Sequence, residues 1–162
     1  MIIRSKKMTS QFMKIVTGLT FVLLMVGVYT KEIGADLTCG MKWPMCDGAI
    51  YGLFPANLPS AIEWLHRFLA LVVGILILVC AYRAWKIYGI EARITRVILF
   101  AVLLLPIQIV LGALTVVKFE VFSRENRILF EPLISVFHNG VGVAILTLLV
   151  AATLWEQEME IN

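Results

Sequence analysis

Long apolar stretches alternate with short polar ones along the chain. Four stretches are long enough to cross a bilayer as helices, because a hydrocarbon core of roughly 30 Å needs about 20 helical residues. They cover residues 13–31, 61–84, 95–118 and 132–155. The pattern predicts an all-α integral membrane protein, with one membrane domain over residues 1–162 and an antiparallel bundle of four transmembrane helices.

The composition supports this prediction. Hydrophobic residues make up 60% of the chain, and the mean hydropathy is +0.92, well above that of a soluble domain. The segment 97–117 contains no charged side chain, and 132–155 contains only His138 as an ionisable group. Nothing of sufficient length remains for a separate soluble domain.

The distribution of Lys and Arg predicts the orientation in the membrane. Eight of these residues lie in the N-terminal segment and in the connection between the second and third helices: Arg4, Lys6, Lys7, Lys14, Arg83, Lys86, Arg93 and Arg96. Five lie on the opposite side: Lys31, Lys42, Lys118, Arg124 and Arg127. We therefore expect a plasma-membrane protein with both termini in the cytoplasm. The net charge of +3 reflects this bias and needs no nucleic-acid partner.

The outer loops are then 32–60 and 119–131. The first contains several glycines and prolines together with three aromatic side chains, which predicts a folded loop rather than a slack linker. It also contains Cys39 and Cys46, on the side of the membrane where disulfides persist. Joining them would stabilise the fold by roughly 2.5 kcal/mol in the chain-entropy model; two free thiols are the alternative.

The chain has two histidines, His66 and His138, each just inside an apolar segment. Imidazole is costly to place in hydrocarbon, so intramembrane histidines are functional candidates. Both predicted helices enter from the outside, which puts the rings at similar depth, on the order of 6–9 Å below the helix ends. We predict that the two rings ligate one haem iron. The alternatives are interhelical hydrogen bonds or a zinc site, which would need further ligands.

Glu63 lies three residues before His66, on the same helical face. It could form a capping box with Ser60 and an ion pair with Arg67, four residues later. A functional carboxylate beside the haem edge, acting as a base or as an electrostatic stabiliser, is compatible with both.

Two further helical features have more than one interpretation. Pro106 should kink the third helix, and Gln108 either bonds to the freed backbone or faces a cavity. Gly140 and Gly142 either let helices approach closely or leave room for a macrocycle beside His138. Cys80 is expected to fill a small packing volume.

Three segments resemble the haem A synthases. Residues 28–46 contain a glycine, a cysteine, Trp43-Pro44 and a second cysteine in the order of that family's first outer loop. Residues 63–67 match its E-x-x-H-R stretch, and residues 108–116 are similar to its third helix. The resemblance covers most of residues 20–145.

The resemblance implies an oxidoreductase that converts a ring methyl of haem O to the formyl group of haem A, for terminal oxidase assembly. His66 and His138 would bind haem b or haem O, Glu63 would be the catalytic carboxylate, and Cys39–Cys46 the loop disulfide. The usual member has eight helices and two histidine pairs, whereas this sequence resembles one half. We therefore expect one haem site or a homo-oligomer, with contacts to haem O synthase or to the oxidase assembly machinery.

Two other functions fit the residues. One is a cytochrome b that only carries electrons, and the other is a membrane thiol–quinone oxidoreductase, although C-x6-C is not its usual spacing. A purely structural assembly subunit is a third alternative.

Overall fold

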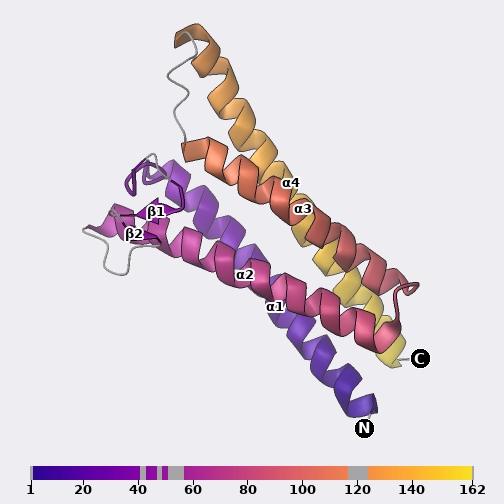
Figure 1. Ribbon diagram of the computed structural model, residues 1–162. Coiled ribbons are helices and arrows are strands. Elements are labelled where there is room, and N and C mark those ends of the chain that lie inside the picture. The colour runs from indigo at the N-terminus through magenta and orange to yellow at the C-terminus, as the bar shows by residue number, and fades with distance from the viewer. Residues whose placement is uncertain (1, 41–42, 47–48, 51–56, 117–123, 162) are drawn as a thin grey trace.

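The computed structural model describes residues 2–40, 43–46, 49–50, 57–116 and 124–161 (Figure 1). Its helices are α1 (Ile2–Glu32), α2 (Leu58–Tyr88), α3 (Arg93–Val116) and α4 (Arg124–Ile161). Two short strands, β1 (Met45–Cys46) and β2 (Ala49–Ile50), pair antiparallel. All four helices are long and apolar enough to cross a membrane. The predicted all-α fold with four helices that could cross a membrane is confirmed. Of the first outer loop, predicted to be structured, residues 41–42, 47–48 and 51–56 lie outside the described residues.

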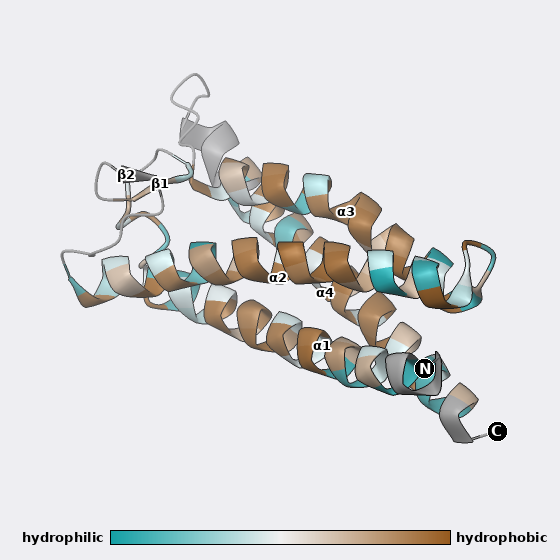
Figure 2. Cartoon of the chain, turned by 60° about the horizontal axis from the view of Figure 1, so that its bottom comes forward, coloured by the Kyte–Doolittle hydropathy of each residue, from teal (hydrophilic) through white to brown (hydrophobic). Residues whose placement is uncertain are grey.

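Each helix packs against the next one in the chain, and α4 closes the bundle against α1. Both termini and the α2–α3 connection lie at one end, which we call the terminal end (Figure 1). The strands lie at the opposite end, which we call the loop end. Hydrophobic residues cover the middle of the helices, and hydrophilic ones gather at the α2–α3 connection (Figure 2). In this arrangement α2 and α4 occupy opposite corners of the bundle.

The apolar core lies mainly in the half of the bundle near the terminal end. Its fully buried members include Val16 on α1, Ile77 on α2, Ile98 on α3 and Ala152 on α4. Polar contacts between helices accompany it, such as the hydrogen bond between the hydroxyls of Thr17 and Thr153 at 3.1 Å. The outward helix faces carry exposed large apolar side chains, as expected of surfaces in contact with lipid.

The ends of α2 are defined by local chemistry. The side chain of Asn57 accepts a hydrogen bond from the Ser60 N–H at 2.9 Å and caps the helix, and Pro59 occupies the first turn, where a missing N–H costs nothing. At the other end Gly89 adopts φ +80°, a conformation that disfavours other residues. Its N–H donates to the Trp85 carbonyl at 3.0 Å.

The helices extend beyond the apolar segments that predicted them. Helix α1 begins at Ile2 rather than near residue 13, and α4 begins at Arg124 rather than at residue 132. The expected outer loop 119–131 is therefore helical from residue 124, while 117–123 lies outside the described residues. Hydropathy marks the stretch that fits the hydrocarbon, whereas polar turns continue a helix past it.

Candidate functional site

His66 lies on α2 with its ring against the backbone of α1. A Cβ atom added at Gly27 would come within 2.7 Å of the ring carbon Cε1 and 3.2 Å of Nδ1. The backbone carbonyl of Leu23, one turn earlier on α1, interacts electrostatically with the same ring. The imidazole therefore rests directly on the surface of the neighbouring helix, at a point where that helix has no side chain.

His138 lies on α4 and repeats this arrangement against α3. A Cβ atom added at Gly112 would come within 3.0 Å of its Cε1 and 3.6 Å of its Nδ1. The backbone carbonyl of Gln108, four residues before Gly112, interacts with the ring. Each histidine is thus placed by a glycine of the adjacent helix and by the carbonyl one turn before it.

The two rings also interact electrostatically with each other. Because α2 and α4 stand at opposite corners, this interaction runs across the interior of the bundle. Both imidazoles therefore lie on the inner side of the helices, in the half near the loop end.

Several polar atoms near these rings are buried without a hydrogen-bond partner among the described residues. They include Nδ1 of His66, Nδ1 of His138 and Oε1 of Gln108. For the two imidazoles, the polar groups that interact with the rings electrostatically include the Leu23 and Gln108 carbonyls of the adjacent helices. In the described part of the chain, no set of three or more His, Cys, Asp or Glu side chains could hold a metal ion. A haem would need only axial imidazoles from the protein, because the porphyrin supplies the equatorial ligands, and His66 and His138 fit that requirement.

The two small residues after His138 have different surroundings. Gly142 lies against Leu24 Cδ2 at 2.7 Å and Gln108 Nε2 at 3.1 Å, measured to an added Cβ, whereas nothing lies within 4 Å of Gly140. Gly142 therefore serves close helix packing. The amide of Gln108 points toward Gly142 on α4. Among the described residues, it makes no hydrogen bond to the backbone carbonyl that Pro106 leaves without a donor.

Glu63 is 2% exposed and is held by three donors. Its Oε2 accepts from the Cys39 N–H at 2.7 Å and from the Thr38 hydroxyl at 3.2 Å. Its Oε1 accepts from the Arg67 guanidinium, which also donates to the Met45 carbonyl. The carboxylate is therefore fixed by the loop segment that ends on the two cysteines.

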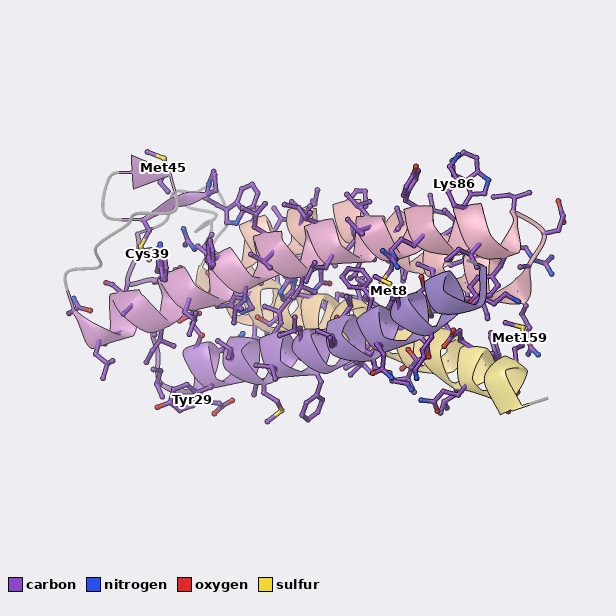
Figure 3. All side chains as sticks on the ribbon, turned by 90° about the horizontal axis from the view of Figure 1, so that it is seen from below. Met8, Tyr29, Cys39, Met45, Lys86 and Met159 are labelled. Carbon is purple, nitrogen blue, oxygen red and sulfur yellow. A yellow bond between two sulfur atoms is a disulfide. The ribbon has the colours of Figure 1, made fainter. Side chains whose placement is uncertain are left out.

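Cys39 and Cys46 form a disulfide, with Cα atoms 4.3 Å apart. The two residues are 7% and 0% exposed, and Figure 3 shows Cys39 and Met45 together at the loop end. Two aromatic residues expected to fold with this loop, Tyr51 and Phe54, lie outside the described residues. The bridge is a buried element that presents the Cys39 N–H to Glu63.

The capping-box prediction for Glu63 is wrong, because α2 begins three residues earlier than expected and Asn57 caps it. Ser60 is then already helical, and its hydroxyl donates to the Thr38 carbonyl at 3.4 Å. The predicted ion pair between Glu63 and Arg67 is present. Because Glu63 does not cap the helix, its carboxylate accepts hydrogen bonds from Thr38 and Cys39 in the loop.

Sequence reasoning missed the glycines that contact the imidazoles. Both belong to a Gly-x-x-Thr sequence, Gly27 with Thr30 and Gly112 with Thr115, and this repetition was the available signal. It also missed the contact between the Lys31 ammonium and the Ser135 hydroxyl, which joins α1 to α4 one turn from His138.

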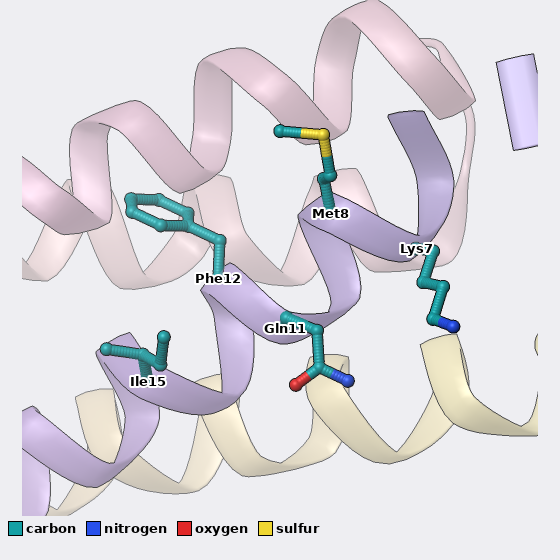
Figure 4. Close-up of a pocket in the computed structure, with 5 residues that line it drawn as sticks. All are labelled: Lys7, Met8, Gln11, Phe12 and Ile15. Carbon is teal, nitrogen blue, oxygen red and sulfur yellow. The ribbon is translucent and has the colours of Figure 1, made fainter. Parts of the chain in front are cut away.

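A shallow depression on the surface of α1 lies near its N-terminal end (Figure 4). It is lined by α1 residues alone: Lys7, Met8, Gln11, Phe12 and Ile15. Residues 7–15 are several turns from Gly27, so this depression is separate from the histidines.

Comparison with known proteins decides the family. A family described as cytochrome oxidase assembly protein (COX15-CtaA) matches residues 10–161. The chain belongs to this family. A haem A synthase from Bacillus licheniformis is 32% identical over 90% of this chain and 47% of its own length. One from Bacillus pumilus is 39% identical over 60% of this chain and 33% of its own. The predicted membership in the haem A synthase family is confirmed.

A protein of Halobacterium salinarum named protoheme IX farnesyltransferase is also similar, with 29% identity over 93% of this chain and 30% of its own length. No solved structure matches the chain. The chain spans about half, or less, of the length of these relatives, so the activity of a whole family member is a proposal here.

Proposed function

We propose that this chain binds one haem between His66 and His138 and takes part in the oxidation of a haem O ring methyl to the formyl group of haem A. One observation carries the proposal. Two imidazoles from opposite corners of a membrane bundle interact electrostatically across its interior, and each ring lies against a glycine of the adjacent helix. Family membership makes haem the group of choice for such a pair.

In this proposal, different residues of the chain would have different roles. His66 and His138 hold the iron, and the apolar helix faces accommodate the farnesyl tail of the substrate. Converting the methyl to a formyl group removes four electrons and adds one oxygen atom, so an external electron acceptor and an oxygen donor such as water or dioxygen would be required. Glu63, one turn from His66, would supply a buried carboxylate on the same helix as one of the proposed ligands. To accept a proton it would have to loosen its contact with Arg67 or with the Cys39 N–H.

We further propose that the loop end faces the outside of the plasma membrane and that both termini are cytoplasmic. Two features support this orientation. The disulfide lies at the loop end, and disulfides persist outside the cytoplasm. The segments at the terminal end are rich in Lys and Arg.

A functional link to haem O synthesis is part of the proposal. The Halobacterium protein named protoheme IX farnesyltransferase contains a region similar to nearly all of this chain. We propose that haem O reaches this chain from such an enzyme.

We also propose that the chain forms a homo-oligomer. Light scattering in detergent would measure its size.

Co-expression with a source of haem O, followed by haem extraction and mass analysis, tests the function. The proposal predicts a formyl haem that disappears in the His66→Ala/His138→Ala double variant. Bound haem without a formyl group would indicate an electron-carrying cytochrome b. Protein without haem would favour a thiol oxidoreductase, which the burial of Cys39 and Cys46 disfavours.

A further inference from the structure

The glycines within the helices fall into three groups by their surroundings, of which one is Gly142, where an added Cβ would meet Leu24 Cδ2 at 2.7 Å. For Gly18, Gly74 and Gly140, nothing lies within 4 Å of the position that a Cβ atom would take. For Gly27 and Gly112, the first atom met is Cε1 of a histidine ring, at 2.7 Å and 3.0 Å. Gly27 and Gly112 are thus the two described helical glycines that lie against an imidazole ring.

The same contact is built twice, once in the α1–α2 pair and once in the α3–α4 pair. In each pair the ring lies against a glycine, and the carbonyl four residues before that glycine, Leu23 for His66 and Gln108 for His138, interacts electrostatically with the ring. Since α-helical residues four apart lie one above the other, glycine and carbonyl form one flat patch on the helix. We call each patch an imidazole seat.

We propose that Gly27 and Gly112 are positioning residues, which set the orientation and the reach of the two axial imidazoles. The inference rests on the proposed haem site and adds to it the residues that aim its ligands. A Cβ atom at either seat would push on the ring, and the ring can yield because rotation of a histidine about χ2 is soft. An alanine at either position should therefore change the orientation of the imidazole rather than the stability of the fold.

The geometry also predicts an order of effects. An added Cβ at position 27 would meet the His66 ring at 2.7 Å, so the ring must move; at position 112 the distance to the His138 ring is 3.0 Å, so a smaller shift suffices. Groups that orient a metal-bound histidine typically change metal affinity by about 10–100-fold when altered. We expect Gly27→Ala to weaken haem retention by about tenfold and Gly112→Ala to do so by less.

The experiment compares four alanine variants of the full chain purified with haem: Gly27→Ala, Gly112→Ala and, as matched controls, Gly18→Ala and Gly74→Ala. Electron paramagnetic resonance of the oxidised protein reports the orientation of the axial rings, and transfer of haem to apomyoglobin reports retention. Thermal unfolding is followed in parallel; alanine favours a helix over glycine, so folding should be maintained.

The expected result is a displaced low-spin signal, or a high-spin fraction, for Gly27→Ala, a smaller change for Gly112→Ala and wild-type spectra for both controls. Should Gly27→Ala not fold, the milder Gly112→Ala decides. Wild-type signals and haem retention in every folded seat variant would overturn the inference while leaving the haem site intact. If His66→Ala and His138→Ala also left the haem spectrum unchanged, the proposed haem site itself would fail.

Discussion

The two helix pairs hold their histidines in the same way but surround them with different chemistry. His66 and His138 each rest on a glycine and a carbonyl of the adjacent helix. Three residues before His66 stands Glu63, tied to Arg67 and to the disulfide loop. Three residues before His138 stands Ser135, which accepts from Lys31.

In the proposed function, this difference would separate haem binding from methyl oxidation. Axial ligation would require the same of both rings, and the two glycine contacts match. Oxidation of one methyl group would take place at one edge of the macrocycle, and the buried carboxylate of Glu63 on the α1–α2 side suits such an asymmetric task. We therefore expect substitutions of His66 and His138 to affect haem binding alike. Substitutions of Glu63 and Ser135 should affect the conversion of haem O differently.

The largest effect should come from the imidazoles. His66→Ala and His138→Ala should each abolish the low-spin spectrum of the purified protein, because a haem with one axial ligand lost is held weakly. Optical spectra and haem content measure this loss. Co-expression of the two variants is the control: restored haem binding would show that the ligands come from two subunits, contrary to this account.

The next effect should distinguish Glu63 from its counterpart. Glu63→Gln should retain haem but lower conversion of haem O by about 10²-fold or more, the range usual for a lost acid–base or electrostatic group. Ser135→Ala, the matched change in the other helix pair, should leave conversion near the wild-type rate. Equal rates in the two variants, measured by haem extraction and mass analysis, would remove the asymmetry.

The disulfide should contribute stability to the loop that holds Glu63. Cys39→Ser should lower the free energy of unfolding by about 2.5 kcal/mol, and only under oxidising conditions. Thermal unfolding with and without reductant measures this difference, and Cys80→Ser, which changes the free cysteine, is the control. An equal loss in reductant would mean that the cysteine side chain, and not the bridge, matters.

The smallest effect should follow from Thr38→Val. This change removes the 3.2 Å hydrogen bond from the Thr38 hydroxyl to Glu63 and leaves the Cys39 N–H and Arg67 contacts in place. One neutral donor lost should cost about 1 kcal/mol, a several-fold reduction in conversion rate. A loss as large as that of Glu63→Gln would show that Thr38 has a role of its own.

The sequence allowed the membrane fold and the candidate residues to be predicted, because hydropathy and the cost of intramembrane histidines act along the chain itself. It did not allow the partners of Glu63 to be predicted. Those depend on where α2 begins, and Asn57 moves that point ahead of Ser60. The seats at Gly27 and Gly112 arise from contacts between helices, and the sequence shows them only through the repeated Gly-x-x-Thr pattern.

The central claim is that one chain clamps one haem iron between the imidazoles of His66 and His138. Near-infrared magnetic circular dichroism of the oxidised wild-type protein, combined with haem and protein quantification, tests it most directly. The account predicts the charge-transfer band of bis-imidazole ligation, with one haem per chain. A high-spin haem, or a bis-imidazole band that persists in the double histidine variant, would contradict it.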